Sequence, residues 1–123
     1  MDNVRQRNRN FALECHPSIC DIERETFCLD PASVEANVTP YTKAIMPVDI
    51  FCHSADLEPL MAIARRHGLK VITDSAHAPG ALYKGKYAGT WSDVGCYSLN
   101  YHKHIHTGEG GILVTDNDDI AER

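Results

Sequence analysis

The 123-residue sequence contains no apolar run that approaches the roughly 20 residues needed to cross a bilayer. Its first ten residues, MDNVRQRNRN, are polar and lack the apolar stretch of a secretory signal. Basic residues are outnumbered, with 12 Lys and Arg against 17 Asp and Glu and a net charge of −5. This balance argues against a broad nucleic-acid-binding face or a polybasic membrane anchor. We therefore expect a cytoplasmic protein without nucleic-acid or membrane partners.

The five cysteines include no Cys-x-x-Cys pair, and no internal repeat or low-complexity tract is visible. An odd number of cysteines without paired spacing favours neither a disulfide framework nor a zinc knuckle. The remaining composition, 43% hydrophobic and 24% charged, is that of a globular chain. A chain of this length can bury one core, so a single domain is expected.

Helical patterns occur in two parts of the chain. The clearest lies over residues 55–67, where Leu57, Leu60, Met61 and Ala64 follow the i, i+3, i+4, i+7 spacing and Gly68 is placed to end the helix. A shorter helix is expected after the pair Asp30-Pro31, an N-cap followed by proline at the first helical position, and it should end before Thr39-Pro40.

Short β-type runs separate these helical stretches. We expect strands over residues 18–22, 43–51, 70–74, 94–99 and 112–115, a last helix over residues 118–123, and a weakly ordered lead-in over residues 1–14. Strands separated by helices predict right-handed βαβ units. The fold class is therefore α/β, with a mostly parallel sheet and flanking helices.

In such sheets ligands bind outside the carboxyl ends of the strands. Two polar segments are expected at that edge: residues 74–77 (Asp74-Ser75-Ala76-His77) and residues 98–111, which run from Ser98 through Lys103 to a Gly-Glu-Gly-Gly turn. Taken singly, each of these side chains has an ordinary structural role, such as a turn aspartate, a strand serine or a surface lysine. Their combination at one edge indicates a functional site.

The segment over residues 98–111 allows two interpretations. His102, His104 and His106 alternate, so on an extended segment they would share one face and could bind a metal ion. That site would need a further ligand, such as Asp74, His77 or a cysteine. A metal-dependent hydrolase built on these histidines is one hypothesis.

In the second interpretation Lys103 is the reactive group. It follows a buried strand, is flanked by imidazoles and precedes glycines that let the backbone approach a ligand closely. A lysine held in such surroundings can form a Schiff base with a carbonyl, provided that its amine is partly deprotonated.

Three stretches carry a resemblance to a known family: ETFCLDPASVEANVTPYTKAIMPV, ADLEPLMAIARRHGLKVITDSAHA and SDVGCYSLNYHKHIHTGEGGILVTDND. The third contains a Ser-x-x-x-x-Lys spacing, and an Asp-x-x-His element begins 29 residues before the lysine (103 − 74). Over residues 15–123 the chain resembles the DegT/DnrJ/StrS aminotransferases, pyridoxal-phosphate enzymes that aminate keto-sugars and related precursors. The resemblance implies part of the large domain of the fold-type I aminotransferase fold.

The resemblance also implies roles for particular residues. Lys103 would hold pyridoxal 5'-phosphate through its amine and later move the proton between substrate and cofactor. Asp74 would pair with the pyridine nitrogen and keep it protonated, so that the ring can accept electrons. His77 would lie beside the ring, and Ser98 would bind the phosphate. No metal ion is implied.

Partners follow from the same resemblance. They are a small-molecule amino donor, glutamate or glutamine in the family, and a keto acceptor, with a homodimer expected for full-length relatives. The chain departs from the family at Thr73, usually acidic, at Leu99, usually aromatic, and at Asp49 and Cys52, where His and Gly are common. These departures bear on substrate choice more than on cofactor binding.

Length is the larger departure. Family members are several times longer, so residues 15–123 correspond to a partial large domain without its N-terminal part or the C-terminal small domain. The expected function is that of an aminotransferase fragment. The alternative left open is a catalytically inactive, truncated relic of such an enzyme.

Overall fold

A four-stranded sheet organises residues 16–122, the part of the chain that the computed structural model describes. The expected lead-in over residues 1–14 lies outside this range. The elements in chain order are α2 (Pro31–Asn37), β1 (Ala44–Ile45), α3 (Leu57–His67), β2 (Lys70–Asp74), β3 (Leu82–Tyr83), β4 (Lys86–Tyr87), the 3₁₀ helix η1 (Ala88–Thr90), β5 (Val94–Ser98), β6 (Gly111–Val114) and α4 (Asp118–Ala121).

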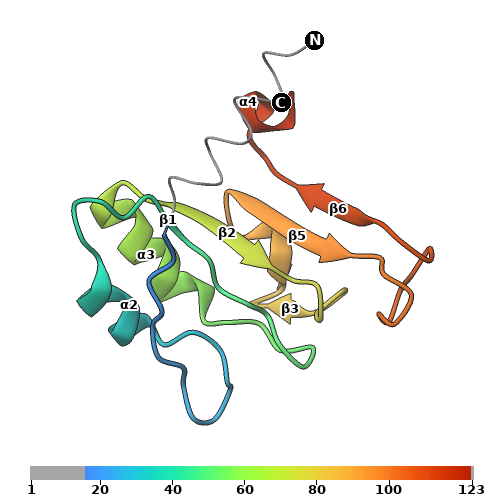
Figure 1. Cartoon of the computed structure of the whole chain (residues 1–123), viewed down its shortest axis with the longest axis horizontal. Helices are drawn as coiled ribbons and strands as arrows, with labels where there is room; N and C mark the ends of the chain where they lie inside the picture. Colours follow the sequence, from blue (N-terminus) through green and yellow to red (C-terminus); the bar gives the residue numbers. More distant parts are fainter. Residues whose placement is uncertain (1–15, 123) are drawn as a thin grey trace.

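The sheet has the order β1-β2-β5-β6 (Figure 1). β2 runs parallel to both β1 and β5, whereas β6 runs antiparallel to β5. The predicted α/β class with a mostly parallel sheet is confirmed. The antiparallel edge strand follows from its connection, because β5 and β6 are joined by a loop rather than by a crossover helix.

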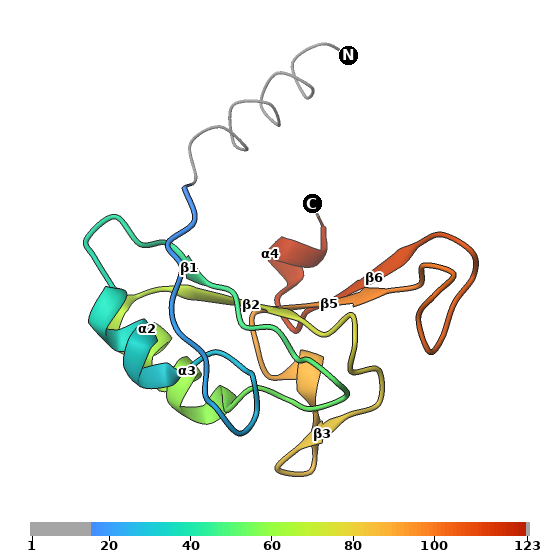
Figure 2. The ribbon, with the colours of Figure 1, turned by 60° about the horizontal axis from the view of Figure 1, so that its bottom comes forward.

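Two helices cover one face of this sheet, and Figure 2 shows α2 and α3 on the same side of it. α2 begins at its predicted N-cap, and α3 ends at its predicted glycine. The Asp30 carboxylate accepts a hydrogen bond from the Ala32 N–H at 2.8 Å, and Gly68 ends α3 in the left-handed conformation at φ 65°. α3 buries Leu57 and Leu60 completely, and each buried leucine contributes about 1.5–3 kcal/mol.

Several predicted strands are shorter than expected. β1 has two residues instead of the range 43–51, because Pro47 donates no hydrogen bond to a ladder. Pairing resumes beyond the proline, where Val48 bridges to Asp74 in parallel. Within the described range the expected strand over residues 18–22 is wrong, since only Ile22 pairs, through an isolated bridge to Leu29.

The connection from β2 to β5 also differs from the predicted βαβ unit. Instead of a helix it contains the β3–β4 hairpin followed by η1. Turn residues interrupt this stretch: Gly80 and Gly85 both have positive φ angles, which glycine adopts without steric cost. η1 then packs so closely under β5 that a Cβ atom on Gly95 would lie 1.9 Å from the Gly89 carbonyl oxygen.

Over residues 16–122 no helix is both long enough and apolar enough to cross a membrane.

Candidate functional site

The carboxyl ends of β2 and β5 bring two predicted site residues to the same edge and face of the sheet. Asp74 ends β2, and Ser98 ends β5. Asp74 pairs with Cys96, so Ser98 lies two residues further along the neighbouring strand and on the same face. Figure 1 shows these two strands side by side and pointing in the same direction. This face is opposite to the one that buries Val71 and Thr73 against the helices.

Asp74 is held firmly by its main chain. Its N–H donates to the Pro47 carbonyl at 2.9 Å, and its carbonyl accepts from the Asp49 N–H at 2.8 Å. One carboxylate oxygen, Oδ1, accepts from the Ala76 N–H at 3.0 Å. Among residues 16–122 the other carboxylate oxygen has no hydrogen-bond partner. Asp74 therefore presents a positioned, half-buried carboxylate with one oxygen available to a ligand.

Ser98 and Lys103 lie at the beginning of the loop that joins β5 to β6. The Ser98 hydroxyl accepts from the Asn100 N–H at 3.3 Å and keeps its own proton for donation. The Lys103 N–H donates to the Asn100 carbonyl at 2.9 Å, which places the lysine in a turn just past the strand end. Within the described range the half-buried Lys103 amine forms no ion pair.

The loop after β1 connects the two polar segments. The Cys52 N–H donates to the His77 carbonyl at 3.1 Å, while the Cys52 thiol lies 3.9 Å from Nε2 of His104. The His77 side chain is exposed. Over residues 16–122 no hydrogen bond or ion pair joins the side chains of the four candidate residues directly. The four candidate residues thus lie around the carboxyl edge of the sheet, and their side chains do not bond to one another.

The histidine run does not assemble a metal centre in the part of the chain that the structure describes. His102, His104 and His106 are all exposed, and no three His, Cys, Asp or Glu side chains between residues 16 and 122 are grouped so that they could hold an ion. The alternating spacing suited an extended segment, but these residues lie in an irregular loop.

Sequence reasoning noted Asp49 only as a departure from the family pattern that bears on substrate choice, and it gave no role to Ser75. Both residues lie behind the candidate site. Both are completely buried, and the Ser75 hydroxyl donates to Oδ2 of Asp49 at 2.7 Å. Burial raises the pKa of Asp49, the hydrogen bond from Ser75 opposes this change, and the nearby charge of Asp74 adds to it. The sequence signal that could have found Asp49 was an aspartate within the apolar run over residues 43–51, where a charged residue is expected to be buried.

The donor set matches the chemistry of a phosphorylated pyridine aldehyde. A primary amine suits a carbonyl, a carboxylate suits a protonated ring nitrogen, and a hydroxyl suits a phosphate. Each of these groups can still form a hydrogen bond or a covalent bond with a ligand, and all lie near the carboxyl ends of β2 and β5. The fold and the site together define an α/β protein built like a pyridoxal-phosphate-dependent aminotransferase.

The chain belongs to the DegT/DnrJ/EryC1/StrS aminotransferase family, whose model matches residues 8–123. GDP-perosamine synthase of Caulobacter vibrioides is 46% identical over 107 residues, covering 87% of this chain and 29% of that protein. L-glutamine:scyllo-inosose aminotransferase of Streptomyces griseus is 46% identical over 113 residues, covering 92% and 27%. The chain thus spans less than a third of the length of these relatives.

Solved structures agree with this assignment. DesI, crystallised in the presence of its TDP-sugar product, superposes with a TM-score of 0.86 at 34% identity, covering 94% of this chain and 29% of that one. Other neighbours were solved with the cofactor bound: a GDP-4-keto-6-deoxy-D-mannose-3-dehydratase of E. coli with hydrated PLP, and NtdA of Bacillus subtilis with PMP.

Proposed function

We propose that this chain supplies the cofactor-binding strand ends of a pyridoxal-phosphate-dependent aminotransferase. The observation that carries the proposal is the placement of Asp74 and Ser98 at the ends of adjacent parallel strands, with Lys103 in the loop that follows. All three lie at the edge where α/β sheets bind ligands.

Each residue has a distinct part in this proposal. The available oxygen of Asp74 holds a proton on the ring nitrogen, because a carboxylate stabilises an adjacent positive charge. The Ser98 hydroxyl donates to the phosphate, and the exposed His77 side chain flanks the ring. Lys103 provides Nζ as nucleophile and then as the base that moves a proton at the substrate carbon. Bound pyridoxal phosphate supplies the carbonyl and an electron-accepting ring.

The substrates we propose are an amino donor, glutamate or glutamine, and a keto-sugar or related keto acceptor. The support is the naming of the relatives, which include a perosamine synthase and an L-glutamine-dependent aminotransferase. We further propose that the enzyme acts as a homodimer. Amino transfer from labelled glutamine to a nucleotide-linked keto-sugar and light scattering in solution test these two statements.

Chemical trapping of the cofactor tests the site directly. The chain is mixed with pyridoxal 5'-phosphate, reduced with borohydride and mapped by peptide mass spectrometry. We expect the label on Lys103 in preference to the other four lysines, Lys43, Lys70, Lys84 and Lys86. Lys103→Arg should lose the label, and the matched control Lys86→Arg should keep it. Equal labelling of all five lysines would contradict the proposal.

A further inference from the structure

Asp49 lies on the helix-covered face of the sheet, behind the candidate site, and none of the roles proposed above uses it. Its side chain is 0% exposed. Oδ1 accepts from the Ala55 N–H at 2.9 Å, and Oδ2 accepts from the Ser75 hydroxyl at 2.7 Å. A buried carboxylate is costly unless it is hydrogen-bonded, so these two donors determine where the Asp49 side chain can lie.

Ser75 links Asp49 to the turn that carries His77. The Ser75 N–H donates to the Cys96 carbonyl at 2.8 Å, and the Ser75 carbonyl accepts from the Ala78 N–H at 3.0 Å. Ser75 is therefore the first residue after β2, and the turn over residues 75–78 begins with it. A hydroxyl anchored to a buried carboxylate restricts how this turn can rotate away from the sheet.

Asp49 also holds the neighbouring segments through the main chain. Its N–H donates to the Asp74 carbonyl at 2.8 Å, and its side chain binds Ala55 at the far end of the loop over residues 50–54. The same loop reaches the turn again, because the Cys52 N–H donates to the His77 carbonyl. One buried residue thus contacts the strand end, the turn and the loop beside it.

We propose that Asp49 is a positioning residue of the candidate cofactor site, which through Ser75 fixes the turn over residues 75–78 and thereby the directions in which Asp74 and His77 present their side chains. This inference rests on the function proposed above. It adds a role for a buried carboxylate that never touches the ligand.

The ionised form of Asp49 is the one that holds the turn best, because a hydroxyl bound to a carboxylate is held more strongly than one bound to a neutral carboxyl. The titratable groups that interact electrostatically with Asp49 within the described range are Asp74, Cys28 and Tyr97, none of which is a cation. Burial raises the pKa of Asp49, so its protonation begins above the pH range of an ordinary aspartate.

Amide hydrogen exchange of the cofactor-free chain, followed by NMR, tests the proposal. Ser75→Ala should speed the exchange of the Ala76, Ala78 and Cys52 amides about tenfold and leave Ala55 unchanged, since the Asp49–Ala55 bond remains. Asp49→Asn should speed all four amides. Asp93→Asn, which removes a hydrogen-bonded carboxylate at the opposite edge of the sheet, is the matched control and should leave the turn unchanged.

The pH profile separates positioning by the charge from a merely structural effect. After correction for intrinsic exchange, protection of the Ala76 and Ala78 amides in the natural sequence should fall as acid protonates Asp49, and in Asp49→Asn this fall should be absent. An unchanged turn in both variants, or equal acceleration throughout the sheet, would overturn the proposal.

Two further features keep this test decisive. If Asp49→Asn does not fold, Ser75→Ala carries the test, because it removes one hydrogen bond and no charge. The exchange needs no cofactor, so failure to label Lys103 refutes the proposed function and leaves the Asp49 result standing. Conversely, labelling at Lys103 with an unchanged turn refutes only the positioning role.

Discussion

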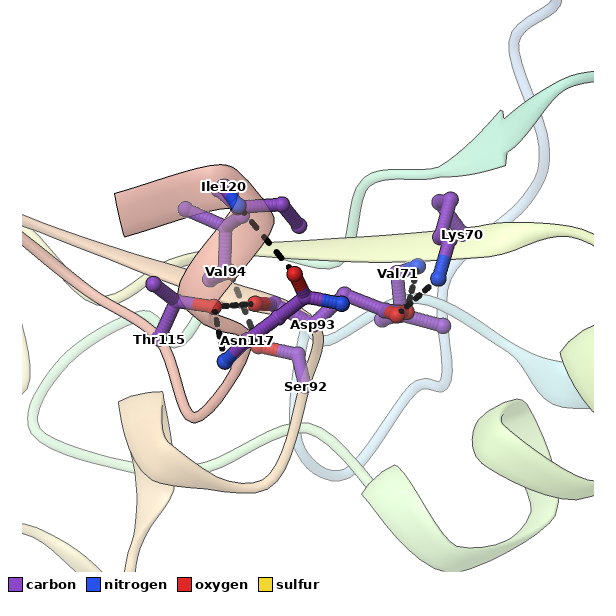
Figure 3. Close-up of polar contacts among 8 residues, drawn as sticks. All are labelled: Lys70, Val71, Ser92, Asp93, Val94, Thr115, Asn117 and Ile120. Carbon is purple, nitrogen blue, oxygen red and sulfur yellow. Dashed lines mark hydrogen bonds and ion pairs between the residues drawn. The ribbon is translucent and has the colours of Figure 1, made fainter. Parts of the chain in front are cut away.

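The parallel strands β1, β2 and β5 begin at one edge of the sheet, the amino edge, and end at the other, the carboxyl edge. Polar residues have different roles at these two edges. At the amino edge the Asp93 carboxylate accepts from the Lys70 ammonium at 2.7 Å and the Val71 N–H at 2.9 Å, while its carbonyl accepts from the Thr115 hydroxyl at 2.6 Å. Figure 3 shows this network, which continues to Asn117, whose side chain caps α4. At the carboxyl edge Asp74 and Ser98 keep bonding capacity, as described above.

This difference separates polar residues that build the fold from those available for chemistry. Both carboxylate oxygens of Asp93 already accept a hydrogen bond from the protein, whereas within the described residues only one oxygen of Asp74 does. Asp49 shows that the carboxyl edge has its own structural carboxylate, but it is placed on the covered face. The open face is left to Asp74. Two hollows among residues 16–122, one bounded by Pro40 and Gly68 and the other by Asp93, lie at the amino edge.

Gly95→Ala should have the largest effect on stability, because it would disrupt the packing of β5 and so the sheet as a whole, including both its amino and its carboxyl edge. The added Cβ would lie 1.9 Å from the Gly89 carbonyl oxygen, a backbone atom that cannot rotate away. We expect the free energy of unfolding to fall by about 3 kcal/mol or more. Urea denaturation measures this loss. Cys96→Ala, on the open face of the same strand, is the control, and equal losses in the two variants would contradict the close packing of η1 under β5.

Asp93→Asn should weaken the amino edge alone. Partial burial favours a higher pKa for Asp93, but the Lys70 ammonium and the Val71 N–H outweigh it and lower the pKa below the ordinary value. The ionised group therefore stabilises the fold above its unfolded-state pKa, and this contribution is lost as pH falls through the lower folded-state pKa.

We expect Asp93→Asn to cost about 1–3 kcal/mol at pH 7, measured by denaturation, and to cost less in acid. Asp116→Asn is the matched control, since that side chain is 94% exposed and its oxygen lies 4.0 Å from the Lys86 ammonium. A loss in Asp93→Asn that stays constant down to acid pH would show that the charge of Asp93 is not responsible.

Asp49→Asn should have the smallest effect on the free energy of unfolding. Its dependence on pH should be opposite to that of Asp93→Asn. Because burial raises the pKa of Asp49, the folded chain binds this proton more tightly than the unfolded chain. In global unfolding, which exposes Asp49 to water, the natural protein is therefore favoured below the unfolded-state pKa, and this advantage is lost as pH rises through the folded-state pKa. Local opening of the turn, in which Asp49 stays buried and loses only the Ser75 hydrogen bond, has the opposite dependence on pH. Relative to the natural sequence the variant should be worst in acid, and denaturation at several pH values measures the trend. A deficit that shrinks in acid, as for Asp93→Asn, would remove the distinction between the two carboxylates.

Local signals predicted much of this fold. The helix over Leu57–His67 was predicted within two residues, because its apolar spacing and Gly68 act within a few residues of each other. β2 and β5 were placed for the same reason, as short apolar runs that end in polar residues. η1 was not predicted, because its close packing depends on Gly89 and Gly95 approaching across the fold. The β3–β4 hairpin was missed although its turn at Lys84 and Gly85, both with positive φ angles, is a local signal.

The sequence by itself determined the chemical inventory: a lysine, an aspartate, a serine and a histidine at spacings that resemble one enzyme family. It also determined the α/β class, because helical and strand periodicities alternate along the chain. Only the tertiary structure decided which carboxylate faces which side. Asp49 lies within one apolar run and Asp74 at the end of another, and the runs themselves do not say which face of the sheet each carboxylate takes. Parallel pairing beyond Pro47 buries one behind the sheet and leaves the other on its open face, because successive side chains of a strand point to opposite sides.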